Sequence, residues 1–237
     1  PLGAHSPGRC CTISNMKTYL ALKMSHADPL PGQFRNDDVR YPDELVEHFV
    51  REYTKPGDVV LDPFAGFGTT LKVAERLNRV AYGVELEPMR AAWVREGLRQ
   101  PENLMQGDAR SLSGLNIPRV DLAMTSPPYM NRGDIEDPLS AYLVDGQGYE
   151  AYLQGLTEVF RQVRELLKPD GRLVIEIANL KSREGVTTLA WDIGRLVAES
   201  MRFEGEVVVC WDHYGYGYDH SYCLVYSLGQ AVGRERA

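Results

Sequence analysis

The sequence predicts an α/β fold in which helices cover both faces of a doubly wound, mostly parallel sheet. Short apolar runs alternate with amphipathic helical stretches between residues 42 and 201, which is the pattern of parallel strands joined by helical crossovers. A glycine-bearing loop joins the first of these runs to the helix that follows it. The last two apolar runs have no helix between them, so we expect an antiparallel pair at the edge of the sheet.

The first element of this pattern is a helix that begins at Pro42. Proline suits the first turn of a helix, and the acidic residues Asp43 and Glu44 follow it there. Apolar residues then recur at helical spacing as far as Tyr53, and the helix ends before Lys55-Pro-Gly. Further helices are expected over residues 69–78, 87–99, 149–167 and 188–201.

Short runs of apolar residues with polar or turn-forming neighbours predict buried strands. Such runs occupy residues 59–62, 80–85, 103–106, 120–125, 172–178, 205–211 and 221–228. A turn is expected at residues 168–171, Lys-Pro-Asp-Gly. Residues 1–39 mix Gly, Pro, Ser and Asp without sustained periodicity, so they predict a loop-rich N-terminal arm ahead of a single domain at residues 40–230.

Composition and charge limit the classes of protein to consider. With 237 residues, of which 43% are hydrophobic and 25% charged, the chain can bury one sizeable core. No apolar stretch approaches a membrane span and no secretory signal opens the chain, so we expect a cytoplasmic protein without membrane contact. The four cysteines lack the paired spacing of a zinc site, and no metal site is predicted. The net charge of −7 argues against tight nonspecific binding to nucleic acid.

The loop at residues 62–70 reads Asp-Pro-Phe-Ala-Gly-Phe-Gly-Thr-Thr and runs from a strand into a helix. Gly66 and Gly68 have no Cβ, so the backbone can approach a ligand closely. No Gly-Lys-Ser/Thr follows, which excludes the phosphate loop of nucleotide hydrolases. Glu85 ends the next strand, where an acid can accept hydrogen bonds from ribose hydroxyls, and Asp108, after the third strand, can accept from an adenine amino group.

The segment Ser126-Pro127-Pro128-Tyr129 closes the fourth strand and is the most specific motif in the sequence. Its prolines donate no backbone hydrogen bond and fix φ, which leaves nearby carbonyls as acceptors at a strand end. Hydrogen bonds from an exocyclic amine to Ser126 Oγ and the Pro127 carbonyl would draw the nitrogen toward tetrahedral geometry and localise its lone pair. The Tyr129 ring can stack on an extruded base.

Together these motifs resemble those of the amino-methylating DNA methyltransferases, a family within the class I S-adenosylmethionine methyltransferases. The resemblance implies a Rossmann-like fold, S-adenosyl-L-methionine as cofactor, and a segment at Arg40-Tyr41-Pro42 that lies against the methionine end of that cofactor. The cofactor-binding residues that it implies are Tyr41, Pro42, Asp62, Pro63, Phe64, Gly66, Gly68, Thr69, Glu85, Asp108 and Ala109. The catalytic residues that it implies are Ser126, Pro127, Pro128 and Tyr129.

Serine in the first position of the Ser-Pro-Pro-Tyr motif is typical of family members that modify cytosine N4. The resemblance therefore implies methyl transfer to that amine in DNA, as in restriction–modification systems. Adenine N6 and the bases of RNA stay open as alternatives, while a non-catalytic binding subunit and a nucleotide-dependent dehydrogenase fit the motifs less well. Methylation at cytosine C5 would need a Pro-Cys nucleophile after the fourth strand, and no cysteine lies there.

Residues 40–230 are expected to form one methyltransferase catalytic domain without a separate target-recognition domain, because no long insertion interrupts them. Sequence specificity for DNA then comes from short loops or from a separate specificity partner, or is absent, and a homodimer is also left open. Residues 130–148 leave the catalytic strand directly and are expected to contact the nucleic acid.

Overall fold

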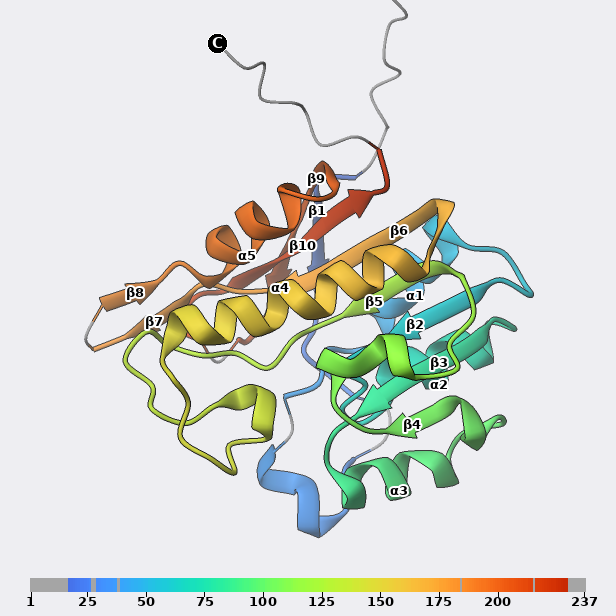
Figure 1. The fold of residues 1–237 in the computed structure, drawn as a ribbon, viewed down its shortest axis with the longest axis horizontal. Helices are drawn as coiled ribbons and strands as arrows, with labels where there is room; N and C mark the ends of the chain where they lie inside the picture. The colour runs from blue at the N-terminus through green and yellow to red at the C-terminus, as the bar shows by residue number, and fades with distance from the viewer. Residues whose placement is uncertain (1–16, 27–28, 38, 184, 215, 230–237) are drawn as a thin grey trace, which may run out of the picture.

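The computed structural model describes residues 17–26, 29–37, 39–183, 185–214 and 216–229 (Figure 1). These residues contain one eight-stranded sheet. In spatial order its strands are β1 (Tyr19–Leu22), β9 (Arg202–Trp211), β10 (His220–Ser227), β6 (Leu167–Ile177), β5 (Val120–Thr125), β2 (Val59–Asp62), β3 (Val80–Glu85) and β4 (Leu104–Gln106). β10 runs antiparallel to both neighbours and the other pairs are parallel. The predicted fold class, with its antiparallel final strand, is confirmed.

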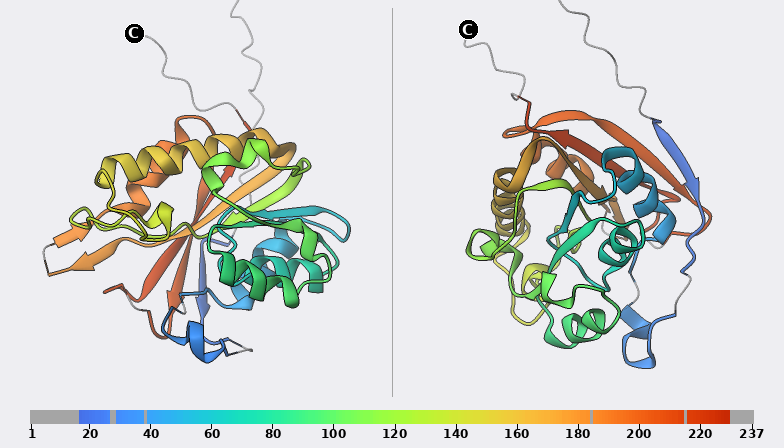
Figure 2. Two further views of the ribbon diagram at one scale, coloured as in Figure 1. Left: turned by 60° about the horizontal axis from the view of Figure 1, so that its bottom comes forward. Right: turned by 90° about the vertical axis from the view of Figure 1, so that its right-hand side faces the viewer.

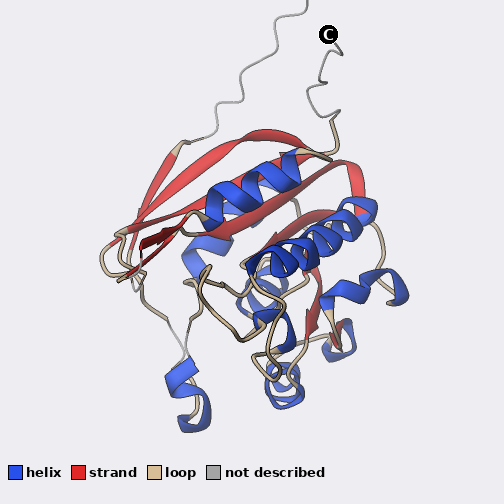
Figure 3. Cartoon of the chain, turned by 60° about the vertical axis from the view of Figure 1, so that its left-hand side comes forward, coloured by secondary structure: helices blue, strands red, loops and turns tan. Residues whose placement is uncertain are grey.

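Helices cover both faces of the sheet, as Figures 2 and 3 show. The α-helices are α1 (Asp43–Tyr53), α2 (Thr69–Arg76), α3 (Pro88–Glu96), α4 (Tyr149–Leu166) and α5 (Leu189–Ala198), and the 3-10 helices are η1 (Gly32–Asp37), η2 (Pro101–Asn103), η3 (Ala109–Gly114) and η4 (Pro138–Ser140). None of the helices in the described part of the chain is long and apolar enough to cross a membrane.

The sheet separates two apolar cores, and alternation along β6 shows how one strand serves both. Leu173 and Ile175 pack on the side of α4 and α5, whereas Val174 packs on the side of α1 and α2. All three side chains are fully buried. A strand buried on both faces reads as a continuous apolar run, which is why the sequence predicts these strands well.

The strand order reverses between β2 and β5. From β2 the chain continues outward to β3 and β4, and β5 and β6 lie on the other side of β2. Because β2 and β5 pair in parallel, with Val60 opposite Leu122, their carboxyl ends meet at one edge of the sheet. Ligands in doubly wound folds bind in the crevice at such a point. The glycine loop and the Ser-Pro-Pro-Tyr segment therefore leave the sheet side by side.

The N-terminal segment differs from the expectation for residues 1–39. Residues 19–22 form β1, which pairs in parallel with β9 so that Tyr19 lies opposite Val208. The expectation that β9 and β10 form the edge of the sheet was therefore wrong, because β1 covers β9. Four apolar residues are too few to show a period, and β1 is held by a partner almost 190 positions away. Residues 1–16, including Cys10 and Cys11, lie outside the described residues.

Two further local differences follow from short-range geometry. β6 begins at Leu167 and not after the expected turn, because Val120 pairs with Leu167 while Leu122 pairs with Arg172. Residues 168–171 thus form an excursion within the strand. A small hairpin of β7 (Leu180–Ser182) and β8 (Gly185–Thr187) follows β6, and strands of three residues carry no readable alternation.

Candidate active site

A cavity of about 1060 Å³ opens where the strand order reverses. It contains both sets of predicted residues in one continuous space. Those that line it are Tyr41, Pro63, Phe64, Gly66, Thr69, Glu85, Asp108, Ala109, Ser126, Pro127, Pro128 and Tyr129. Pro42, Asp62 and Gly68 do not line it and are buried immediately behind its wall.

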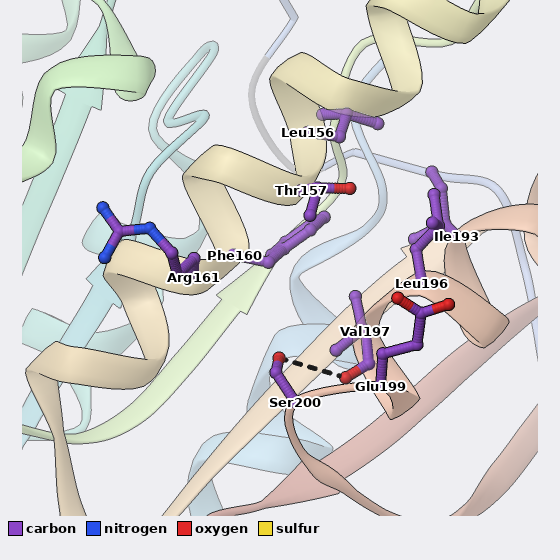
Figure 4. Close-up of a pocket in the computed structure, with 9 residues that line it drawn as sticks. All are labelled: Leu156, Thr157, Phe160, Arg161, Ile193, Leu196, Val197, Glu199 and Ser200. Carbon is purple, nitrogen blue, oxygen red and sulfur yellow. Dashed lines mark hydrogen bonds between the residues drawn. The ribbon is translucent and has the colours of Figure 1, made fainter.

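A second, smaller cavity of about 180 Å³ lies between α4 and α5 (Figure 4). Its walls are mostly apolar, with Leu156, Phe160 and Ile193 among them. Among its lining residues, the Ser200 hydroxyl donates to the Val197 carbonyl at 3.4 Å. No motif from the sequence reaches this cavity, so the larger one is the candidate active site.

The glycine loop uses its two glycines for different reasons. Both have positive φ, 53° at Gly66 and 78° at Gly68, which favours glycine over other residues. A Cβ on Gly68 would overlap the Cγ1 atom of Val94 on α3. A Cβ on Gly66 would meet only the Phe64 carbonyl at 3.8 Å, beside the cavity. Gly68 therefore allows the loop to pack on α3, and Gly66 keeps its ligand-facing side open.

Glu85 fixes the loop from the neighbouring strand. Its Oε2 accepts a hydrogen bond from the Gly66 N–H at 2.8 Å, and its Oε1 accepts one from the Glu87 N–H at 2.9 Å. Arg90 lies 3.5 Å from Oε1. Burial raises the pKa of Glu85, against the lowering effect of these donors. Since each carboxylate oxygen can accept more than one hydrogen bond, Glu85 retains acceptor capacity toward the cavity.

Asp108 lies on the same rim but has a strong partner of its own. The Arg110 guanidinium donates to both of its oxygens, at 2.7 Å from Nη2 to Oδ2 and 3.1 Å from Nε to Oδ1. Burial acts to raise the pKa of Asp108, but the hydrogen bonds from Arg110 outweigh it and lower that pKa. Asp108 is therefore an ionised acceptor at the cavity. Arg110 also reaches toward Asp137, 3.8 Å away in the loop at residues 130–148.

Asp62 is a buried connection between strands and lies away from the cavity surface. It accepts hydrogen bonds from Thr125 Oγ1 at 2.6 Å, the Phe64 N–H at 3.0 Å and Tyr41 Oη at 3.3 Å. These bonds join the end of β2 to the end of β5 and to the segment before α1. Pro42 caps the start of α1 with an extended backbone and is buried behind Tyr41.

The Ser-Pro-Pro-Tyr segment lines the cavity, and its backbone carbonyls differ in whether they already accept a hydrogen bond. Tyr152 Oη donates to the Pro128 carbonyl at 2.7 Å, and Tyr142 Oη lies 3.4 Å from the Tyr129 carbonyl. Among the described residues, the Pro127 carbonyl has no recorded donor. The sequence predicts that this carbonyl accepts a hydrogen bond from the amine, and no group of the described chain donates to it.

A carboxylate and a group of tyrosines beside the Ser-Pro-Pro-Tyr segment were not predicted from the sequence. Glu176, on β6, accepts hydrogen bonds from Ser126 Oγ at 2.9 Å and Tyr129 Oη at 3.0 Å. Tyr216 lies beside Tyr129 with ring centroids 5.1 Å apart, and Tyr214 lies 5.3 Å from Tyr216. Two signals could have found them: a lone acid within the apolar run of β6, and the dense tyrosines before β10.

The loop at residues 130–148 closes one side of the cavity. Pro138, Leu139 and Tyr142 line the cavity, while Leu143 is 81% exposed beside it. The loop is acidic, with Asp134, Glu136, Asp137 and Asp145 in its sequence. Its expected contact with nucleic acid stays a prediction, and these charges disfavour close approach of the acidic part of the loop to phosphates.

A family model described as DNA methylase, N6_N4_Mtase, matches residues 23–94 and 120–229, which is more than half of the chain. The chain belongs to this family of DNA methylases. The matched ranges include the segment before α1, the glycine loop, the Ser-Pro-Pro-Tyr motif and Glu176. The match therefore places the chain among the methylases of the N4/N6 type.

Two curated relatives match short stretches of the chain. Type II methyltransferase M.BglII from Bacillus subtilis is 52% identical over 48 residues, covering 20% of the chain and 13% of that protein. Type II methyltransferase M2.DpnII from Streptococcus pneumoniae is 48% identical over 46 residues, covering 19% of the chain and 17% of that protein. The matches thus span less than a fifth of either relative.

Solved structures share the fold at low identity. TrmN from Thermus thermophilus superposes with a TM-score of 0.57 and 21% identity over 78% of the chain and 48% of that chain. SMU.1697c from Streptococcus mutans, solved in complex with SAH, gives a TM-score of 0.52 and 14% identity over 80% of the chain and 98% of that chain. A TehB-like SAM-dependent methyltransferase from Corynebacterium glutamicum gives a TM-score of 0.52 and 13% identity, over 83% of the chain and 92% of that chain.

The cofactor of this family, S-adenosyl-L-methionine, suits the cavity chemically. It carries hydroxyls and an amino group, for which Glu85 and Asp108 are acceptors, and a carboxylate, for which donors are needed. Arg90 is a candidate donor: its Nε has no hydrogen-bond partner among the described residues and lies 3.7 Å from Glu87 Oε2. The open face of Gly66 leaves room for close backbone approach. The residues present therefore fit this cofactor.

Proposed function

We propose that this chain transfers a methyl group from S-adenosyl-L-methionine to the exocyclic N4 of cytosine in DNA. The observation that carries the proposal is that Ser126, Pro127 and Tyr129 line the same cavity as Gly66 and Glu85. A bound cofactor and an extruded base can therefore meet within one space. The serine in the first motif position favours cytosine over adenine.

In this proposal the cofactor-binding residues are those lining or supporting the first half of the cavity. Glu85 binds the ribose hydroxyls, Asp108 the adenine amino group, and the glycine loop approaches the methionine moiety. When bound, S-adenosyl-L-methionine supplies an electrophilic methyl group. Tyr41, Pro42 and Asp62 support that half from behind, through the hydrogen bonds from Tyr41 Oη to Asp62 and Thr70.

The catalytic residues act on the amine. Ser126 Oγ donates to Glu176, so its lone pairs are free to accept an amine N–H. The Pro127 carbonyl accepts the other, and the two acceptors draw the nitrogen toward tetrahedral geometry. Tyr129 and Tyr216 supply aromatic faces for the base. The Pro128 carbonyl accepts a hydrogen bond from Tyr152 Oη, which fixes the backbone between the Pro127 carbonyl and the Tyr129 ring.

Nucleoside mass spectrometry tests the proposal. The protein is incubated with deuterated-methyl S-adenosyl-L-methionine and, separately, with unmethylated duplex DNA, single-stranded DNA and RNA. We expect labelled N4-methylcytosine in DNA. Labelled N6-methyladenine would keep the reaction type and change the base, label in RNA alone would change the substrate, and 5-methylcytosine would contradict the chemistry.

A further inference from the structure

Glu176 is a buried carboxylate directly behind the proposed catalytic serine. It lies near the end of β6, is 4% exposed, and forms part of the cavity wall. Its Oε2 accepts from Ser126 Oγ at 2.9 Å and Tyr129 Oη at 3.0 Å, and its Oε1 accepts from Tyr214 Oη at 3.3 Å. The carboxylate thus connects the catalytic motif to the segment between β9 and β10.

The donors to Glu176 differ in kind from those to Glu75 and Glu85. Asp62 also accepts from hydroxyls, but it does not line the cavity. Glu75 accepts from the backbone N–H groups of Arg99 and Gln100, at 2.7 and 3.0 Å. Glu85 accepts from backbone N–H groups and faces Arg90. Among the described residues, the recorded donors to Glu176 are hydroxyls, with no ion pair. Burying a carboxylate is costly, and of Asp62, Glu75, Glu85 and Glu176 it is Glu176 that both lines the cavity and accepts from the serine of the motif.

We propose that Glu176 receives, through Ser126, the proton that leaves the target amine during methyl transfer. The inference rests on the proposed function and adds a residue to it. Glu176 acts through Ser126, so it is a positioning residue and proton acceptor, and the groups that touch the base remain Ser126, Pro127 and Tyr129.

The proton transfer balances as follows. The amine nitrogen forms its bond to the methyl carbon, the bond from that carbon to the cofactor sulfur breaks, and the sulfur keeps the electron pair. The nitrogen must then lose one N–H proton to become neutral. Ser126 Oγ accepts that proton and passes its own hydroxyl proton to Oε2 of Glu176. The products are a neutral methylated amine, an unchanged serine and a protonated Glu176.

The surroundings of Glu176 make its titration separable from that of its neighbours. Burial raises the pKa of Glu176, against hydrogen bonds that lower it. The titratable groups that face it from other elements are Tyr41, Tyr129, Tyr214, Tyr216 and Cys223. Burial raises the pKa of each of these as well, so they stay protonated at neutral pH. Glu176 is the member of this group that ionises on the acidic side.

The test measures single-turnover methyl transfer between pH 5 and 9, with saturating tritiated S-adenosyl-L-methionine and excess unmethylated duplex or single-stranded DNA. For the unaltered protein we expect a rate that rises with pH and then levels. Glu176→Gln should be about 100-fold slower at the plateau and lack the acidic limb, as for loss of a general base. Glu176→Asp should keep the limb. Glu75→Gln, a matched buried acid on α2, should match the unaltered protein.

A double-mutant cycle keeps the inference testable if one variant is poorly folded. Ser126→Ala breaks the relay from its other end, so Ser126→Ala/Glu176→Gln should be no slower than the slower single variant. Cofactor binding by calorimetry verifies the fold of each variant. Equal rates and superimposable pH profiles for Glu176→Gln and the unaltered protein would overturn the relay while leaving the proposed function intact. If the unaltered protein methylates no nucleic acid, the proposed function fails first and the relay fails with it.

Discussion

The two halves of the cavity hold their carboxylates in different ways. On the cofactor side, Glu85 is held by the backbone N–H groups of Gly66 and Glu87. On the substrate side, Glu176 is held by the hydroxyls of Ser126 and Tyr129. A backbone N–H fixes direction and cannot release its proton, whereas a hydroxyl can donate and accept at once. One half is thus suited to holding a ligand, and the other to moving protons.

This contrast separates binding from chemistry in a way that mutation can test. Changes on the cofactor side should alter the dissociation constant of S-adenosyl-L-methionine or the stability of the loop. Changes on the substrate side should alter the rate constant while cofactor affinity stays constant.

The largest expected effect is that of Ser126→Ala. Loss of Oγ removes both the acceptor for the amine and the path to Glu176, so kcat should fall by about 100-fold or more. The dissociation constant of the cofactor should stay within about twofold, as measured by calorimetry. Ser200→Ala, in the cavity between α4 and α5, is the matched control and should leave both quantities unchanged. A Ser126→Ala variant with full kcat would contradict the assignment of proton transfer to the substrate side of the cavity.

Glu85→Gln should act on binding. It replaces a charged acceptor for the ribose hydroxyls, which should cost about 1.5–3 kcal/mol in total, so cofactor affinity should fall roughly 10- to 150-fold. Because the change lies outside the substrate half, the rate at saturating cofactor should recover. Equilibrium dialysis with labelled cofactor measures the first effect and single-turnover kinetics the second. An unchanged affinity in a folded variant would show that Glu85 supports the loop without touching the ribose.

Gly68→Ala tests how rigidly the loop packs. The new Cβ would overlap Val94 at a residue with φ of 78°, so we expect the free energy of unfolding to fall by about 1–3 kcal/mol for the backbone, with a further loss from overpacking. Gly57→Ala is the control, because its φ is 90° but no atom lies within 4 Å of the added Cβ. Urea denaturation compares the two. Equal losses would mean that the contact with α3 can relax.

The smallest expected effect is on the pH dependence of stability. Burial raises the pKa of Glu176 in the folded protein above its value in the unfolded chain. Its contribution to stability is then fully present below the unfolded pKa and is lost as pH rises through the folded pKa. Glu176→Gln removes this loss, so the stability of the variant relative to the unaltered protein should increase from pH 5 to pH 8. Urea denaturation at both pH values measures it, and a decrease would mean that the hydroxyls more than offset burial.

The sequence predicts the elements that repeat a pattern and misses those that depend on distant partners. Every predicted helix exists, with ends that differ by a few residues, because amphipathic spacing is a local signal. β1 and the β7–β8 hairpin were missed because runs of three or four residues carry no period.

The candidate site shows the same division. The glycine loop and the Ser-Pro-Pro-Tyr motif are contiguous, so their residues could be singled out before the fold was seen. Asp62, also predicted to bind the cofactor, is buried behind the loop, and its partners Thr125 and Tyr41 come from other elements that the motif does not reveal. Its role toward the cofactor stays a prediction. Glu176 is visible as a lone acid in an apolar run, yet its hydroxyl partners lie as far as 50 positions away.

The pairing of β1 with β9 affects the order in which parts of the molecule fold. The Met24 N–H donates to Asp212 Oδ1 across 188 positions of sequence, and Met24 and Arg40 line the cavity. During synthesis, the segment before α1 has no partner at the sheet edge until β9 has left the ribosome. Closing so long a loop is slow, so this rim of the cavity should assemble last. In the mature protein the same edge should open first, and the amides of β1 should exchange with deuterium before those of β2.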